Sequence, residues 1–345
     1  DTALLSSTAN ARQGAIMAGL IEQSVAYDGE DLDPETARHL GLLRRTDYMP
    51  EHMSLPSDPD LLVETTTIQR RMEGAYGAGR YCPDGEDSCM TLEQLSDVLE
   101  QSRDYDETLA AWLGWRSLFG PMRSDYQRFA ELTTIGAGEF GYRDMGEMWR
   151  SGYDMSPTDF ETEVERLWTQ AKPLYEQLHC FARNRLADHY GEDKVSRDGP
   201  IPAHLLGNMW SQEWTGIYDL LEPYPGVGNL DVTTALEEQG YDAIRVTETG
   251  ERFFTSIGMP ELPETFWDRS MLTRPRDRDV VCHASAWNMN PAVNDVRIKQ
   301  CVVPNASHLE TMHHELGHVY YYLAYNHLPN LYRKGAHDGF HEGIG

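Results

Sequence analysis

The pentapeptide His-Glu-Leu-Gly-His at residues 314–318 determines how the rest of the chain is interpreted. Residues four apart lie on one face of a helix, so His314 and His318 can bind one metal ion. Glu342, a short connection downstream, can supply a third ligand, and Glu315 lies beside the metal as a candidate base. Two histidines, one glutamate and an open fourth position are typical of a catalytic zinc site in a peptidase.

The residues around the pentapeptide predict a long, mostly buried helix followed by a second helix. Ser307 and Glu310 have the S-x-x-E spacing of a capping box, so we expect the first helix to begin just after Ser307. Pro329 is expected to end it, and Asp338 is a candidate N-cap for the second helix, which carries Glu342. The apolar face of the first helix comprises Leu309, Met312, Leu316, Val319, Tyr320 and Leu323.

Length and composition indicate a folded globular protein. The chain has 345 residues, of which 40% are hydrophobic and 10% aromatic, with a formal net charge of −27. This acidity argues against nucleic acid and anionic membrane surfaces as partners. No stretch approaches the roughly 20 apolar residues of a membrane span, and no charged-then-apolar start resembles a signal peptide. The oligomeric state stays open.

The cysteines favour an oxidising compartment. Cys82 and Cys89 flank a short loop, Cys282 and Cys301 flank a predicted hairpin, and Cys180 stands alone in a predicted helix. Two local pairs suggest two disulfides and an exported protein, either secreted and extracellular or periplasmic. Metal ligation is less favoured, because neither pair has C-x-x-C spacing.

Most of the remaining pattern is helical, so the predicted class is mainly α. Helices are expected over residues 91–118, 159–190 and 203–221, the second of them broken or kinked near Pro173.

Two segments read as strands, residues 280–287 and 297–303, joined by a turn-rich linker. This hairpin directly precedes the predicted metal helix. An edge strand there could hold an extended peptide through main-chain hydrogen bonds.

Several longer blocks resemble the angiotensin-converting enzyme family of zinc dipeptidyl carboxypeptidases. These blocks are residues 199–210, 253–258, 281–287, 297–301, 313–318 and 339–345. The resemblance covers residues 66–345 in order, whereas residues 1–65 form a weakly matching N-terminal helical segment. It implies a single but incomplete peptidase domain over residues 1–345. The family fold is a large helical two-lobed ellipsoid around a deep cleft, with a small antiparallel β element beside the zinc helix.

The resemblance also implies roles for the residues of the zinc motif. His314, His318 and Glu342 match the Zn²⁺ ligands, and Glu315 matches the general base that later returns a proton to the leaving amine. His341 adjoins a ligand and is expected to be a supporting or surface residue. The implied activity removes dipeptides from the free C-terminus of small peptides. The cysteine pairs Cys82–Cys89 and Cys282–Cys301 match family disulfides.

Further positions match the family outside the zinc motif. His283 and Ala284 match residues that hydrogen-bond the substrate backbone, and Gln212 matches a group that binds the C-terminal carboxylate. Arg116 and Tyr153 match chloride ligands, which makes chloride a second candidate ion. Each has a structural alternative: His283 as an ordinary strand histidine, Gln212 as a helix contact, and the chloride pair as residues at the edge of the core.

The chain departs from the family pattern at two positions and continues only to Gly345. Asn288 stands where the family usually has Asp, and Glu213 replaces a usually uncharged residue beside Gln212. A charge there could weaken capture of an anionic C-terminus or change side-chain preference. The family continues beyond this point with further groups for the carboxylate, the oxyanion and chloride, so we expect this chain to be a fragment.

Three classes of function therefore remain at the level of sequence. The first is a zinc peptidyl-dipeptidase. The second is another helical zinc oligopeptidase, which the blocks at residues 207–210 and 282–287 disfavour. The third is an inactive fragment or a non-enzymatic relative that binds zinc or peptide. The intact ligands and Glu315 argue against a degenerate site.

Overall fold

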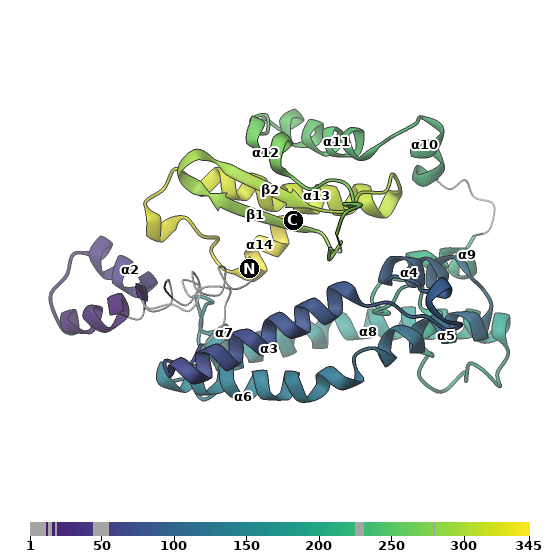
Figure 1. Cartoon of the computed structure of the whole chain (residues 1–345), viewed down its shortest axis with the longest axis horizontal. Coiled ribbons are helices and arrows are strands. Elements are labelled where there is room, and N and C mark those ends of the chain that lie inside the picture. The colour runs from purple at the N-terminus through teal and green to yellow at the C-terminus, as the bar shows by residue number, and fades with distance from the viewer. Residues whose placement is uncertain (1–11, 13–15, 18, 44–54, 225–230, 279) are drawn as a thin grey trace.

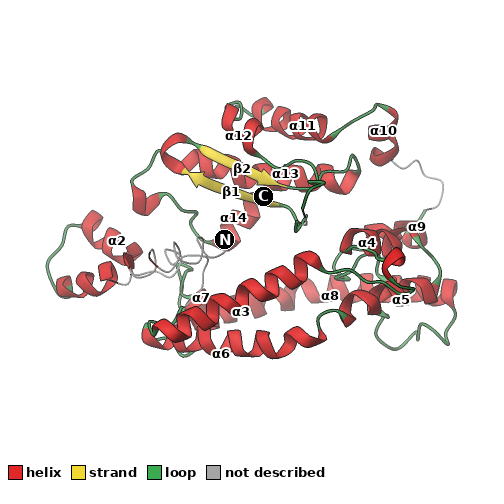
Figure 2. Ribbon diagram, in the orientation of Figure 1, coloured by secondary structure: helices red, strands yellow, loops and turns green. Residues whose placement is uncertain are grey.

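The computed structural model describes residues 12, 16–17, 19–43, 55–224, 231–278 and 280–345. This part of the chain is mainly helical, with one two-stranded sheet (Figure 2). The α-helices are α2 (Pro34–Leu43), α3 (Pro59–Ala78), α4 (Leu92–Gln101), α5 (Tyr105–Ser117), α6 (Arg123–Glu139), α7 (Met145–Arg150), α8 (Pro157–Tyr190), α9 (Tyr218–Leu221), α10 (Val232–Glu238), α11 (Ala243–Ser256), α12 (Glu264–Arg269), α13 (Ala306–Tyr325) and α14 (Asp338–Ile344). The strands are β1 (Ser285–Asn290) and β2 (Asp295–Lys299). The predicted class, mainly α with a small antiparallel β element, is confirmed.

The elements from α3 to α14 form two layers (Figure 1). One contains α3 to α9, and the other contains α10 to α14 with the hairpin. The two layers are in contact at Gly77 and at Arg274. Gly77 of α3 packs so closely on Val281 that an added Cβ would lie 3.2 Å from the Val281 side chain. Arg274 also forms an ion pair of 3.3 Å with Glu93 of α4. A deep cleft between two lobes stays a prediction. No helix in the described residues is long and apolar enough to cross a bilayer.

The first layer begins with helices that the sequence pattern only partly predicts. Helix α3 was not expected; Asp58 caps it by accepting the N–H groups of Asp60 and Leu61, and Pro59 occupies its first turn. The predicted helix over residues 91–118 is instead two helices. Helix α4 ends before Ser102, and Asp104 caps the start of α5. Much of the segment 1–65 lies outside the described residues.

Helix α8 is continuous over 34 residues, with Ser156 as its N-cap and Pro173 inside it. The helix is therefore not interrupted at Pro173, and the alternative, a kink there, stays a prediction. Good helix formers surround this proline, so the loss of one N–H donor does not end the helix. Much of α8 is solvent-exposed, including an apolar stripe made of Val164, Leu167, Trp168, Leu174, Tyr175 and Leu178.

The predicted helix over residues 203–221 is also wrong. This segment contains two short 3₁₀ turns and only one turn of α-helix, α9. Gly207 has φ of 83° and Ser211 has φ of 60°, both in the left-handed region. Two such residues within five positions end any right-handed helix there.

The hairpin is shifted relative to its prediction. β1 and β2 pair antiparallel, with Ser285 opposite Lys299 and Ala286 opposite Ile298. Residues 280–284 precede the strand, and residues 288–290, expected in the linker, belong to β1. β2 ends at Lys299 because the next N–H groups, those of residues 300 and 302, donate to the carbonyls of residues 271 and 272.

Helices α13 and α14 have other caps than those predicted. Asn305, in an extended conformation, accepts the N–H of His308 at 2.7 Å, so α13 begins at Ala306 and not after Ser307. It ends at Tyr325, four residues before Pro329. For α14 the cap is His337, whose Nδ1 accepts the N–H of Phe340 at 3.0 Å, and Asp338 is the first helical residue.

The core of the second layer holds α13 in place. Its buried members include Met312 and Leu316 of α13, Val246 and Phe254 of α11, and Ile298 of β2. Helix α11 crosses α13 closely at Gly250. A Cβ on Gly250 would lie 2.6 Å from Cδ1 of Leu316, a residue of the zinc pentapeptide.

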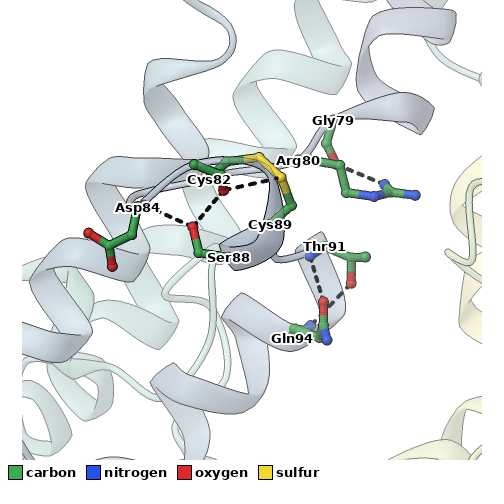
Figure 3. Close-up of a disulfide and its surroundings, with 9 residues drawn as sticks. Gly79, Arg80, Cys82, Asp84, Ser88, Cys89, Thr91 and Gln94 are labelled. Atoms are coloured by element: carbon green, nitrogen blue, oxygen red, sulfur yellow. Dashed lines mark hydrogen bonds between the residues drawn. A yellow bond between two sulfur atoms is a disulfide. The ribbon is translucent and has the colours of Figure 1, made fainter.

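Both predicted disulfides are present, Cys82–Cys89 and Cys282–Cys301. Figure 3 shows the first one closing a loop beside the start of α4, where Thr91 forms a capping box with Gln94. The second joins Cys282, three residues before β1, to Cys301, two residues after β2. Cys180, in α8, is a free thiol.

Candidate metal centre

Three predicted ligands converge between α13 and α14. Nε2 of His314 and Nε2 of His318 lie 3.0 Å apart. The carboxylate oxygens of Glu342 lie 3.3 Å from His314 Nε2 and 3.6 Å from His318 Nε2. These three residues offer one ligand atom each within 4.8 Å of one another.

The close approach of the two helices depends on Gly317. A Cβ at this position would lie 2.9 Å from Cα of Gly345 and 3.1 Å from the carbonyl oxygen of Ile344. Glycine at the fourth position of the pentapeptide therefore lets the end of α14 lie directly against α13. This contact positions Glu342 opposite the two histidines.

The three ligands fit zinc. Bonds of 2.0–2.1 Å in a tetrahedral site place neighbouring ligand atoms about 3.3 Å apart. The observed separations of 3.0, 3.3 and 3.6 Å bracket this value. Two imidazole nitrogens and one carboxylate oxygen form a donor set that zinc accepts, and they leave a fourth position free.

The site is buried on one side and open on the other. The side chain of His318 is 9% exposed, whereas those of His314 and Glu342 are 39% and 65% exposed. Burial lowers the pKa of His318, so its imidazole is neutral near pH 7 and its nitrogen lone pair is available to a metal. A substrate could therefore approach from the side of Glu342.

His341, which adjoins a ligand, lies behind His318. The two Nδ1 atoms are 2.7 Å apart, so one ring donates a hydrogen bond to the other. Burial, followed by the nearby His318, lowers the pKa of His341 to about 4. His341 Nε2 lies 3.4 Å from the hydroxyl of Tyr325. A neutral hydrogen-bonded chain thus fixes the orientation of the His318 ring.

Glu315, the predicted base, is buried and belongs to the same turn of α13 as His314 and His318. Burial raises its pKa to about 7, and the negative charge of Glu342 acts in the same direction. The charge of Lys299 opposes this shift. A carboxyl group with a pKa near neutrality is suited to accept and return a proton at physiological pH.

Two residues near Glu315 were not identified from the sequence. Lys299, the last residue of β2, interacts electrostatically with Glu315. Tyr322 of α13 donates its hydroxyl to the carbonyl of Ala286 at 3.3 Å, and burial raises its pKa to about 12. The hairpin brings Lys299 to α13 by strand pairing, which a local sequence pattern does not reveal.

A cluster of three amides also joins the hairpin to the end of α13. Asn288 donates to Asn326 at 2.8 Å, and Asn326 donates to Asn294 at 3.2 Å. Asn288 is the position where the sequence departs from the usual aspartate. An uncharged amide fits this neighbourhood because Asn326 is only 4% exposed and is itself an amide.

His283 and Ala284, the two residues predicted to bind the substrate backbone, directly precede β1. The ring of His283 is exposed, and its Nδ1 lies 2.9 Å from the carbonyl oxygen of Ala284. His283 also lines a small hollow between the two layers, together with Arg80, Glu93 and other residues. The structure leaves both residues accessible, and their role in binding a peptide stays a prediction.

Gln212 lies in the segment that joins α8 to α9, in the first layer, and its role in binding a carboxylate stays a prediction. Gln212 is exposed in the turn after residue 210, and its N–H donates to Asn208 Oδ1 at 3.3 Å. Among the described residues, no hydrogen bond or ring contact joins Gln212 to His283. Glu213 is exposed and lies near Glu100, whose pKa is raised by burial first and also by the charge of Glu213.

The two candidate chloride ligands lie apart. Arg116 donates to the carbonyl of Met209 at 2.6 Å and stacks on Trp112 with its guanidinium carbon 3.6 Å from the ring centre. Tyr153 packs against Phe160 of α8 and His337. Helices α5 and α7 lie toward opposite ends of the first layer (Figure 1), so these residues do not share one ion site.

The arrangement of the metal group defines a class of proteins. A helix-borne His-Glu-x-x-His group with a glutamate from the next helix is the site of the zinc metallopeptidases of that motif. Residues 2–345 match the family profile described as angiotensin-converting enzyme. The chain therefore belongs to the angiotensin-converting enzyme family, which confirms the resemblance.

Individual relatives agree with this assignment. The chain is 43% identical to the angiotensin-converting enzyme of Theromyzon tessulatum over 274 residues, which are 78% of this chain and 44% of that protein. It is 37% identical over 317 residues to that of Haematobia irritans exigua, covering 90% of this chain and 50% of that protein. For the enzyme of Sus scrofa the identity is 43% over 287 residues, covering 82% of this chain and 22% of that protein. The chain thus spans half or less of these relatives.

Proposed function

We propose that this chain is a zinc metallopeptidase unit that removes dipeptides from the free C-terminus of small peptides. The observation that carries the proposal is the convergence of His314, His318 and Glu342 around one point, with the buried Glu315 beside them. Family membership supports the metallopeptidase class.

The chemistry proposed for the site is amide hydrolysis. Zinc, when bound, polarises the scissile carbonyl and lowers the pKa of the attacking water. Glu315 accepts the proton of that water and returns it to the amine as the C–N bond breaks. His341 and Tyr325 hold the His318 ring in position throughout.

The hairpin is the proposed support for the peptide backbone. His283 and Ala284 lie at the entry to β1, and the Ala286 carbonyl is tied to α13 by the hydroxyl of Tyr322. An extended peptide could add along this strand through main-chain hydrogen bonds. This geometry supports peptide binding, whereas the dipeptide length of the product rests on the resemblance to the family.

The compartment and the second ion also belong to the proposal. The disulfides Cys82–Cys89 and Cys282–Cys301 support an oxidising compartment, which we propose to be extracellular or periplasmic. We propose Arg116 and Tyr153 as ligands of two separate chloride sites, one at each residue.

Mass spectrometry of the cleavage products tests the proposal. An unblocked nonapeptide is incubated with the zinc-loaded chain, with and without a chelator. We expect chelator-sensitive loss of two residues at a time from the C-terminus. Single-residue loss or internal cuts would move the assignment to another zinc peptidase. No cleavage by the folded, zinc-loaded chain would contradict the enzymatic assignment and favour a peptide-binding relative.

A further inference from the structure

Lys299 is a cation at the candidate site that the proposed chemistry does not use. It is the last residue of β2 and pairs with Ser285, the first residue of β1. Ser285 directly follows Ala284, one of the two residues proposed to bind the substrate backbone. Strand pairing therefore places Lys299 beside the proposed path of the peptide.

The other cations near the hairpin already have partners. Arg269 and Arg297 both bind Asp295, at 2.6 and 2.8 Å. Lys299, in contrast, makes no hydrogen bond or ion pair from its ammonium group within the part of the chain that the structure describes. Its side chain is half-buried, and burial lowers its pKa. A partly desolvated ammonium without a partner is stabilised by any anion that can reach it.

The charge that Lys299 does face is that of Glu315. The two groups interact electrostatically without a direct ion pair. Lys299 thus lies within electrostatic range of Glu315, and its donors stay free for another group.

The net charge of the chain makes such a cation useful. The formal charge is −27, and at the site itself the two positive charges of bound zinc would offset those of Glu315 and Glu342. A peptide that carries a carboxylate is repelled by this field as it approaches. One local cation beside the substrate strand offsets this repulsion and favours anionic peptides over neutral ones.

We propose that Lys299 binds a carboxylate of the peptide and thereby selects for anionic substrates. The carboxylate is either the free C-terminus or an acidic side chain near the scissile bond. This inference rests on the proposed function, because it takes the hairpin as the peptide-binding strand.

Binding of ketomethylene peptides tests the inference without turnover, since the scissile N–H is replaced by a methylene group. One pair of peptides differs only in a terminal carboxylate or carboxamide, and a second pair only in Glu or Gln before the scissile position. Dissociation constants are measured by isothermal titration for the zinc-loaded chain and for Lys299→Met and Lys299→Arg. Lys172→Met, on the exposed face of α8, is the matched control because it changes the net charge equally.

We expect Lys299→Met to weaken binding of the carboxylate member of one pair about tenfold and to leave its neutral member within about twofold. The pair that responds identifies the source of the carboxylate. Lys299→Arg should retain the preference, and Lys172→Met should have no effect.

Equal weakening of charged and neutral peptides would overturn the inference. Unchanged dissociation constants for Lys299→Met would also overturn it, and so would a parent chain that binds none of the peptides. Near-ultraviolet circular dichroism and zinc content check that each variant is folded. A chain that shows the Lys299-dependent preference but does not cleave ordinary peptides would refute the proposed activity and leave this inference standing.

Discussion

The side-chain amide of Asn288 in β1 donates to Asn326, the residue that follows α13, at 2.8 Å. Asn326 returns a bond of 3.3 Å to Asn288 and donates to Asn294 at 3.2 Å. These bonds join both ends of the hairpin turn to the end of the zinc helix. The buried residue Asn326 therefore helps to fix the position of the hairpin relative to α13, together with the Tyr322–Ala286 bond and the shared apolar core.

Replacement of Asn326 by alanine should destabilise the fold by about 1 kcal/mol, because it removes the bonds that this buried residue makes to the half-buried Asn288 and the exposed Asn294. Urea unfolding followed by circular dichroism measures the change. Asn330→Ala is the control, since Asn330 is exposed in the following turn. Equal stability of both variants would show that the amide cluster does not hold the hairpin.

Substitution of Gly250 by alanine should destabilise the protein by about 1–3 kcal/mol, because the new Cβ would overlap Leu316 at the crossing of α11 and α13. Gly74→Ala is the matched control. Gly74 has open space around its Cα, so alanine there should stabilise α3 by about 0.5–1 kcal/mol. Thermal unfolding distinguishes the two, and a Gly250→Ala variant as stable as Gly74→Ala would refute the close crossing.

Asp295 should contribute stability that is lost in acid. Arg297 and Arg269 hold its pKa at about 2, below the value of about 3.9 in an unfolded chain. The stabilisation is therefore fully present above about pH 4 and is lost as the pH falls from 4 toward 2. We expect Asp295→Asn to be less stable than the parent at pH 7, with the difference shrinking toward pH 2.

Asp268→Asn, an exposed change of the same charge in α12, provides the control for the acid series. Its unfolding free energy should follow that of the parent at every pH. A constant difference between Asp295→Asn and the parent across pH 2 to 7 would contradict the ion-pair account.

Loss of one metal ligand should abolish most of the zinc affinity. His318→Ala is expected to weaken zinc binding by more than about 100-fold, because even residues behind the ligands are worth 10–100-fold. Zinc at 100 times the dissociation constant of the parent should stabilise the parent by about 2.7 kcal/mol and His318→Ala by less than about 0.4 kcal/mol. Isothermal titration and thermal shift measure both effects, with exposed His327→Ala as the control. Unimpaired zinc binding by His318→Ala would place the metal elsewhere.

The sequence was sufficient to locate the metal group because its determinants are local. His314 and His318 follow from the period of one helix, and Glu342 from a short connection to the next. The same pattern reasoning assigned the wrong cap to α13. Asn305 and Ser307 can both cap a helix, and only the backbone conformation, extended at Asn305, decides between them.

The rest of the site depends on contacts between distant segments. Residues 203–221 look helical in composition, yet the positive φ angles at Gly207 and Ser211 turn the chain into short 3₁₀ pieces. Lys299 reaches Glu315 only through the pairing of β1 and β2 and the packing of the hairpin on α13. Such relationships arise from tertiary packing, which residue periodicity does not encode.

Comparison of zinc content and peptide hydrolysis in Glu315→Gln tests the central claim most directly. Glu310→Gln is the matched control, because Glu310 is an exposed glutamate five residues before Glu315 on α13. We predict that Glu315→Gln keeps one zinc per chain and loses at least about 100-fold in hydrolysis rate, while Glu310→Gln resembles the parent. Hydrolysis by Glu315→Gln at the rate of the parent, with zinc bound, would contradict the account.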